Sequence, residues 1–301
     1  KTPGLWQEGR RQKGGSVGYF YGWYFKCQSQ GQTLAVIPAI HQSGGRRTCS
    51  LQVITEEEVR RAEFPGEVFR KKGRQILMGG SRFGERGIIL DVHEPGLEIR
   101  GRLKFGALSP LAYDIMGPFS LVPFLECRHS VLSMKHSVRG TVDFNGRTYG
   151  FEGAEGYWEG DRGHSFPREY IWTHCSFPGG ALMLSVADVP VAGFHFRGII
   201  GVVLWQGREY RFATYLGARA VRPENGAVRV IQGGMELEAG LLERKFLEKT
   251  GKILKAPAKG QMVRTIRESA ACRACYRFRR MRHTILEFET DRASFEYEYS
   301  G

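Results

Sequence analysis

The sequence predicts an all-β protein with few short helices, and three observations support this class. The chain has 301 residues, of which 40 are glycines that separate short segments rich in β-branched and aromatic residues. Hydrophobic residues make up 42% of the chain and aromatic residues 12%, which is enough for a packed core. Strands do not alternate with long helical patterns along the chain. These features favour a sandwich or barrel architecture.

The expected strands follow one another with turn residues between them. They cover residues 19–28, 32–41, 49–55, 74–108 in several pieces, 126–144, 147–151, 156–163, 170–177, 181–190, 196–205, 208–217, 228–242, 260–269, 274–282 and 284–290. Asn145–Gly146 and Gln206–Gly207 are two-residue turn signals between flanking strands. The last residues, 294–301, resemble an acidic and aromatic tail.

Three segments depart from this strand pattern. Thr55 and Glu58 form a T-x-x-E signature, which predicts a short surface helix over 56–63. Three prolines within 110–123 exclude a regular central strand and predict a long structured loop over 111–125. The segment 241–249 fits either a strand end or a short helix.

A division near residue 150 gives two domains of similar size, 1–150 and 151–301. Each half contains enough strands to close a barrel, and a barrel of roughly eight to ten strands can enclose one small apolar ligand. The sequence therefore predicts two β domains with room for a hydrophobic molecule.

The formal net charge of +13 favours anionic partners, which include lipid head groups, nucleic acid and acidic ligands. No apolar run approaches the roughly 18–20 residues that span a bilayer. We therefore expect a cytoplasmic protein with at most peripheral contact with an anionic membrane. The 6 cysteines are too few for a disulfide scaffold, and Cys272–Cys275 lacks the second pair of a zinc site.

The richest stretch for chemistry is 156–177, GYWEGDRGHSFPREYIWTHCSF. Tyr157, Glu159 and Asp161 alternate, so on a strand they share one face. Carboxyl groups among aromatic rings suit an acid-catalysed reaction on an apolar, unsaturated molecule. The alternative is a buried structural strand whose carboxylates pair with Arg162, Arg168 or backbone amides.

Two further charged segments have competing interpretations. Glu126, Arg128, His129 and His136 fit an ion-pair lattice that seals a barrel end, because the two histidines lack a zinc-ligand spacing. The arginine-rich run 272–283 fits a solvated strand or contact with anionic membrane. It matches no nucleic-acid-binding signature, so we do not expect a nucleic acid partner.

Several motifs resemble the tocopherol cyclase family in this order and spacing. They are FYGWYF (20–25), YWEGDRG (157–163), SFPREYIW (165–172), LSVADVP (184–190), ATYLGA (213–218), LKAP (254–257) and MVRTIRE (262–268). The resemblance implies two lipocalin-like β-barrel or sandwich domains, related to carotenoid hydratases, with a hydrophobic cavity within or between them. Tocopherol cyclases add a phenol hydroxyl across a prenyl double bond, and the hydratases add water across a similar bond.

The family pattern Tyr-x-acid-x-(Asn or Asp)-x-Gly implies catalytic roles for Tyr157, Glu159 and Asp161. We expect Glu159 to be the general acid, with Asp161 raising its pKa and Tyr157 orienting the acid or the substrate. The expected substrate-binding residues are Trp23, Tyr24, Trp158, Trp172, His164 and His174, where each histidine has the alternative of being a hydrogen-bonded core residue.

The implied reaction is a cofactor-independent, metal-free cyclisation of a prenylated or isoprenoid lipid. Tyr21 stands where family members often have Glu, so activity or substrate can differ here. A non-catalytic lipid carrier and a hydratase remain the alternatives, and the sequence leaves the oligomeric state open.

Overall fold

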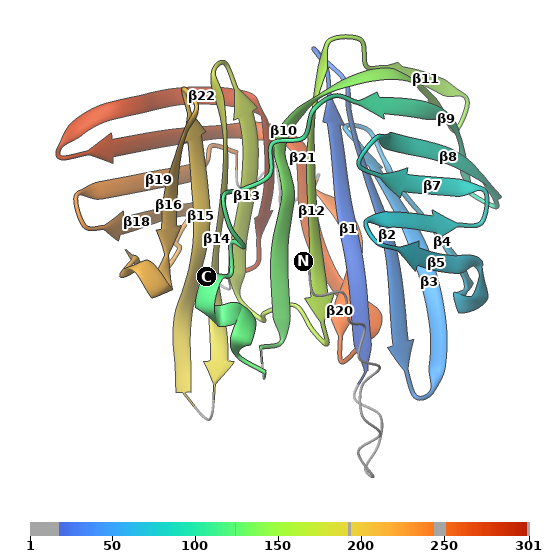
Figure 1. The fold of residues 1–301 in the computed structure, drawn as a ribbon, viewed down its shortest axis with the longest axis horizontal. Coiled ribbons are helices and arrows are strands. Elements are labelled where there is room, and N and C mark those ends of the chain that lie inside the picture. Colours follow the sequence, from blue (N-terminus) through green and yellow to red (C-terminus); the bar gives the residue numbers. More distant parts are fainter. Residues whose placement is uncertain (1–17, 124, 192–193, 244–250, 300–301) are drawn as a thin grey trace.

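The structure is a computed structural model that describes residues 18–123, 125–191, 194–243 and 251–299. Within these ranges the chain forms 22 strands and three short 3-10 helices. The strands build two curved antiparallel sheets that stand side by side (Figure 1). The all-β, two-domain lipocalin-like class is confirmed.

The first sheet has 12 strands in the order β4-β3-β2-β1-β12-β10-β9-β8-β7-β6-β5, with β11 paired to β10. Its strands are β1 (Tyr19–Gln28), β2 (Thr33–Ser43), β3 (Arg46–Thr55), β4 (Val59–Pro65), β5 (Phe69–Lys72), β6 (Gln75–Met78), β7 (Ser81–Gly84), β8 (Gly87–Glu94), β9 (Leu97–Phe105), β10 (Cys127–Phe144), β11 (Arg147–Gly150) and β12 (Ala154–Gly163). All pairs are antiparallel, so most neighbours are joined by short turns.

The second sheet has 10 strands in the order β16-β15-β14-β13-β22-β21-β19-β18-β17, with β20 paired to β21. Its strands are β13 (Tyr170–Phe177), β14 (Gly180–Val191), β15 (Phe194–Trp205), β16 (Arg208–Ala213), β17 (Arg219–Ala220), β18 (Ala227–Gln232), β19 (Met235–Leu241), β20 (Lys252–Ala258), β21 (Gln261–Arg280) and β22 (His283–Tyr297). The last strand extends to Tyr297, into the segment expected to be a tail, and it pairs with both β13 and β21.

The chain changes sheets between Gly163 and Tyr170, later than the expected division near residue 150. Strand β12 pairs with β1 and β10, so it completes the first sheet after the β10–β11 hairpin. A division at 150 would remove this central strand from its sheet. The hairpin turn is adjacent in sequence, whereas the return of β12 to β1 is a long-range pairing that local patterns do not reveal.

The 3-10 helices are η1 (Gly66–Val68), η2 (Gly117–Leu121) and η3 (Thr214–Leu216). The loop expected over 111–125 is present over its described residues, 111–123 and 125, and contains η2. The helix expected over 56–63 is wrong, because this segment turns into β4 and pairs with β3. The Thr55 hydroxyl does accept hydrogen bonds from the amides of Glu57 and Glu58, but it closes a turn and not a helix. Residues 244–250 lie outside the described residues, so the alternative over 241–249 stays open there.

Two turns follow the sequence signals. Asn145 and Gly146 have φ values of 48° and 83°, and Gln206 and Gly207 have 48° and 75°. These left-handed pairs are typical of tight two-residue hairpins. Gly163, the last residue of the YWEGDRG motif, has a different constraint: a Cβ there would lie 2.0 Å from the carbonyl oxygen of Glu126.

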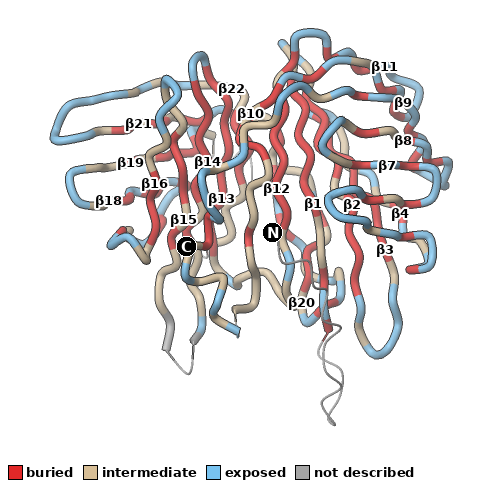
Figure 2. Tube along the Cα trace, viewed as in Figure 1, coloured by how far each residue is buried: buried red, intermediate tan, exposed pale blue. Residues whose placement is uncertain are grey.

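Three apolar clusters hold the molecule together. One lies inside the first sheet and one inside the second, and the third joins the two sheets. The tube in Figure 2 shows the buried central strands and the exposed outer turns. The third cluster contains Tyr24 and Tyr157 from the first sheet with Trp172 and Ile266 from the second. Contact between the sheets is therefore part of the core.

The arginine-rich run becomes the outer part of β21, and carboxylates of neighbouring strands face it. Arg277 lies 3.2 Å from Glu238 and 2.5 Å from Glu287, and Arg279 lies 3.3 Å from Glu236. Such exposed pairs add little stability. They do balance the charge of this surface, which weakens it as an anion-binding site.

Among the described residues, the structure contains no helix with the length and apolar composition needed to cross a lipid bilayer.

We expect Trp158→Ala to lower the free energy of unfolding by about 3–5 kcal/mol, because it leaves a cavity in the core of the first sheet. Trp158 is fully buried and its ring stacks on Phe25 at 4.9 Å between centroids. Urea denaturation measures the loss. Half-buried Trp205→Ala is the matched control and should cost clearly less; equal losses would contradict this assignment of Trp158 to the core.

Candidate functional site

A cavity with an empty volume of about 1340 Å³, which includes solvent at its mouth, lies between the two sheets. Its walls come from β1, β2, β3, β10 and β12 on one side and from β13, β14, β15, β20, β21 and β22 on the other. Most of the lining is aliphatic or aromatic. Five carboxyl groups interrupt this apolar surface. Four of them, from Glu159, Asp161, Glu268 and Glu296, lie on strands, and the fifth belongs to Glu126, just before β10.

Glu159 projects from the central strand β12 into the cavity. In the strand register it lies between Tyr24 on β1 and Val131 on β10. The alternation of β12 directs Tyr157, Glu159 and Asp161 to this side. Tyr157 donates a short hydrogen bond to Glu159 Oε2, and the indole Nε1 of Trp172 donates to the same oxygen at 3.2 Å.

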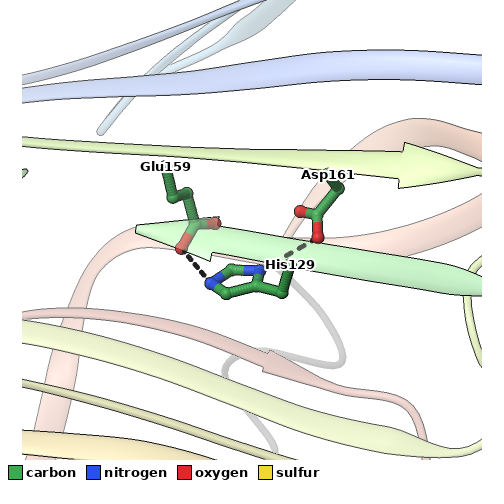
Figure 3. A group of neighbouring side chains, drawn as sticks. All are labelled: His129, Glu159 and Asp161. Atoms are coloured by element: carbon green, nitrogen blue, oxygen red, sulfur yellow. Dashed lines mark hydrogen bonds and ion pairs between the residues drawn. The ribbon is translucent and has the colours of Figure 1, made fainter. Parts of the chain in front are cut away.

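His129 on β10 lies between the two carboxyl groups (Figure 3). Its Nδ1 is 2.9 Å from Asp161 Oδ1, and its Nε2 is 3.1 Å from Glu159 Oε2, off the line of a well-aligned hydrogen bond. Burial lowers the pKa of His129, but the two carboxylates outweigh burial and raise the pKa well above its ordinary value. An imidazolium at this position balances one of the two acids.

The two oxygens of Glu159 have different surroundings. Tyr157 and Trp172 donate hydrogen bonds to Oε2, and His129 lies at ion-pair distance from the same oxygen, while Oε1 has no hydrogen-bond partner among the described residues. Burial raises the pKa of Glu159, and the donors only partly oppose that effect. The side chain is thus suited to carry a proton on Oε1 and to be stabilised as a carboxylate after the proton has left.

Tyr157 remains a hydrogen-bond donor in this arrangement. Burial and then the neighbouring Glu159 raise the pKa of its phenol well above 10.0, so the hydroxyl stays protonated. Its ring stacks on His174 at 3.7 Å between centroids. His174 itself is buried, and burial lowers its pKa well below 6.5, so it supports Tyr157 as a neutral ring.

The second sheet supplies two more acids to the opposite wall. Tyr24 of the first sheet donates to Glu268 Oε1 at 2.6 Å, and Tyr170 donates a short hydrogen bond to Glu296. Burial raises the pKa of Glu268 to about 7, with a further contribution from Glu159. Burial, then Glu268, raises the pKa of Glu296 well above its ordinary value. The cavity therefore holds several carboxyl groups that favour the protonated form.

Three of the six expected substrate-binding residues line the cavity: Trp23, Tyr24 and Trp172. Tyr24 and Trp172 meet edge to face at 5.5 Å between ring centroids, directly beside Glu159. Trp23 also belongs to the core of the first sheet, where it stacks on Phe69 at 5.9 Å.

The other three expected residues do not line the cavity. Trp158 points to the opposite side of β12 from Glu159 and fills the core of the first sheet. His164 is half-buried near the end of β12, where its backbone bonds Glu126 and Gly260. His174 lies behind Tyr157. Their places beside aromatic residues in the sequence did not specify which side of a strand they face.

The alternative pairing of the carboxylates with Arg162 and Arg168 is not the arrangement observed, because both arginines are exposed and His129 takes the partner role. His129 itself is not part of a lattice at a barrel end. Tyr21, which replaces the family Glu, stacks on Trp23 at 3.8 Å and does not line the cavity.

His129, Glu159 and Asp161 form the one group among the described residues whose donor atoms could approach a metal ion, all within 4.8 Å of one another. The two carboxylates lie against opposite nitrogens of the imidazole ring. The donor set fits a proton-sharing group better than a metal centre.

Comparison with known proteins decides the family. The sequence profile described as Tocopherol cyclase-like matches residues 96–297, which is more than half of the chain. The chain belongs to this family. A search of curated proteins finds no match to it.

Solved structures with similar folds cover almost the whole chain of this tocopherol cyclase-like protein. CghA with Sch210972 has a TM-score of 0.56 at 9% identity, and the similarity covers 94% of this chain and 89% of CghA. A putative AttH from Nitrosomonas europaea has a TM-score of 0.52 at 11% identity and covers 99% of both chains. Kievitone hydratase from Nectria haematococca has 0.50 at 8%, covering 93% and 89%. At these identities the similarity establishes the shared fold.

Sequence reasoning missed the contributions of His129, Glu268 and Glu296 to the cavity. Glu268 closes the MVRTIRE motif, where Ile266, Glu268 and Ala270 alternate as buried residues of β21. That alternation was the available signal for an inward-facing acid. Glu296 fell in the assumed tail, and its position became visible only when β22 paired with β13.

We expect stability to fall as the pH rises from about 4.5 to about 7, because Glu268 binds a proton in the folded state over this range and loses it in the unfolded state. Glu268→Gln removes that proton uptake and should flatten the fall. Urea midpoints measured at several pH values provide the check, with exposed Glu67→Gln as the control. An unchanged slope in the Glu268 variant would disprove the assigned pKa.

Proposed function

We propose that this protein is a cofactor-independent, acid-catalysed cyclase that protonates a prenyl or related isoprenoid double bond. Membership of the tocopherol cyclase-like family supports an enzyme of the cyclase or hydratase type. The observation that carries the proposal is Glu159, a buried acid in an apolar cavity. One of its oxygens accepts two hydrogen bonds and lies beside the His129 ring, and the other oxygen has no hydrogen-bond partner among the described residues.

In the proposed reaction Glu159 donates its proton to one carbon of the substrate double bond. The other carbon becomes a tertiary cation, and the substrate's own hydroxyl oxygen forms a bond to it. The donors on Glu159 Oε2 stabilise the carboxylate that remains, and their fixed positions require no reorganisation. Substrate and product have the same composition, because the hydroxyl proton replaces the one that was donated.

The hydroxyl proton needs an acceptor, and Glu268 fits this role. It faces the same cavity from the second sheet, and its raised pKa of about 7 leaves part of it ionised near neutral pH. Once Glu159 becomes negative, its charge favours proton uptake by Glu268. Tyr24 fixes the orientation of the Glu268 carboxyl through the 2.6 Å hydrogen bond.

The aromatic wall suits the cationic intermediate. Tyr24 and Trp172 present ring surfaces next to Glu159, and a cation over such a ring is stabilised by about 0.5–2 kcal/mol. The apolar remainder of the lining excludes water from the cation, which favours capture by the substrate hydroxyl. If a water molecule reached the cation before the substrate hydroxyl did, the same acid would catalyse hydration of the double bond, which is the reaction of a hydratase.

The rival function is a lipid or isoprenoid carrier that uses the cavity without chemistry. It needs the apolar lining but has no use for a protonated carboxyl group. Recovery of a bound hydrophobic ligand in unchanged form after prolonged incubation would favour the carrier.

We expect Glu159→Gln to lower turnover of prenylated hydroquinones by at least about 10²-fold while ligand affinity stays within a few-fold, because the amide keeps the shape and loses the transferable proton. Product formation is measured by mass spectrometry, and affinity by quenching of tryptophan fluorescence. Reactions in D₂O should place one deuterium on carbon, and H₂¹⁸O should label the product only in a hydratase.

Glu155→Gln is the matched control, since Glu155 lies on the same strand but forms a half-exposed ion pair with Lys135. It should leave turnover unchanged. Full activity of the Glu159 variant would refute the proposed acid, and a wild-type protein that binds but never converts the ligand would favour the carrier.

A further inference from the structure

Four segments are joined to one another by hydrogen bonds, and three of them contribute residues to the cavity lining; together the four are the rim. They are the β2–β3 turn (43–48), the loop that carries η2 up to the start of β10 (115–123 and 125–128), the β12–β13 connection (162–168) and the β20–β21 turn (257–262). In Figure 1 the β2–β3 turn, the η2 helix and the β20–β21 turn all lie at the lower edge of the molecule.

The hydrogen bonds link the segments one after another. Gln261 bonds the Ser43 hydroxyl at 3.0 Å, and the amide of Lys259 bonds the Ser165 hydroxyl at 2.9 Å. The amide of His164 bonds the carbonyl of Glu126 at 2.9 Å. The rim is thus one continuous surface, and residues from three of its segments line the cavity: Phe119, Leu125, Glu126, Cys127, Phe166, Pro167, Pro257 and Met262.

The rim is strongly basic. It carries one acidic residue, Glu126, against six basic residues: Arg46, Arg47, Arg128, Arg162, Arg168 and Lys259. All of the basic residues except half-buried Arg128 are exposed, and none forms an ion pair with another described residue. This distinguishes the rim from the outer part of β21, where carboxylates balance the arginines.

An apolar projection stands within this basic surface. The run 115–125 contains no charged residue, and Leu121 at the end of η2 is 82% exposed. Pro118 and Pro123 beside it are exposed as well, while Phe119 of the same helix faces the cavity. Arg128 bonds the carbonyl of Val122 at 2.9 Å and so ties the loop to β10.

We propose that the rim docks on an anionic lipid surface, with Leu121 inserted among the acyl chains and the basic residues against the head groups. Each basic residue near such a surface raises the partition coefficient about fivefold. The cavity mouth would then open toward the lipid, so an apolar ligand could pass along Phe119 without crossing water. This inference concerns binding to a surface and does not depend on turnover.

The test is cosedimentation with vesicles of phosphatidylcholine alone and of phosphatidylcholine with 30% phosphatidylglycerol. We expect the wild-type protein to bind the anionic vesicles, and to bind them less as salt rises. Leu121→Asp should weaken partition about tenfold, because a leucine side chain is no longer buried in lipid. Met281→Asp is its control, since Met281 is 69% exposed at the β21–β22 turn with a φ of 47° that aspartate tolerates.

Two triple variants distinguish an effect of the position of the basic residues from an effect of the total net charge. Arg46→Glu/Arg47→Glu/Lys259→Glu alters the rim, and Arg70→Glu/Arg82→Glu/Arg102→Glu alters exposed residues of β5, β7 and β9. Each replaces three positive charges by three negative ones, so each lowers the formal net charge from +13 by 6, to +7. We expect the rim triple to lose at least about a hundredfold in partition and the other triple to lose much less.

Several outcomes would overturn the proposal. They are absence of vesicle binding, equal losses in the two triples, or full binding by Leu121→Asp. The rim would be a general polyanion-binding surface if the rim triple lost binding to a DNA duplex and Leu121→Asp had no effect on vesicle binding. A change of oligomeric state in Leu121→Asp with vesicle binding unaltered would assign the projection to self-association. Glu159→Gln should bind vesicles like the wild-type protein. The vesicle test therefore stands even if the catalytic proposal fails.

Discussion

The proposed chemistry depends on keeping one carboxyl group uncharged in an apolar cavity. His129 lies between Glu159 and Asp161, so one imidazolium faces two acids. Among the described residues no arginine or lysine forms an ion pair with Glu159 that would balance the second negative charge. Burial makes an unbalanced carboxylate costly, and binding a proton removes that cost. The same arrangement keeps donors on Glu159 Oε2. These donors stabilise the carboxylate, so the acid can still release its proton.

The local part of this site could be predicted from the sequence, and the long-range part could not. Strand alternation places Tyr157, Glu159 and Asp161 on one side of β12 because the period of a strand depends only on its own backbone. Glu268 reaches Tyr24 across 244 residues of sequence, which requires two sheets to assemble in one particular way. The T-x-x-E signature at Thr55 shows the converse limit: its local hydrogen bonds form, yet pairing of β4 with β3 overrides the helix.

The position of the cavity between the sheets explains why the site needs both of them. The proposed acid comes from β12 of the first sheet, while Trp172, Glu268 and Glu296 come from the second. If a single barrel enclosed the ligand, all of these groups would have to come from one domain. Here each sheet fills its own interior with side chains, as Trp158 does in the first, and the ligand space is left at the contact between them. Changes that loosen this contact would disturb the spacing of acid and acceptor before they unfold either sheet.

The positive net charge and the acidic cavity are compatible because they act over different distances. Charges on the surface are screened within about 8–10 Å in physiological salt, so arginines of the rim have little influence on an enclosed carboxyl. Inside, burial raises the pKa of Glu268 and of Glu296. The charge of Glu159 adds to the shift of Glu268, and the charge of Glu268 adds to that of Glu296, with little screening. Protonation state at the site is therefore set by the cavity wall. The net charge of the whole chain could therefore point to an anionic partner for the outer surface, but it gave no information about the acid inside.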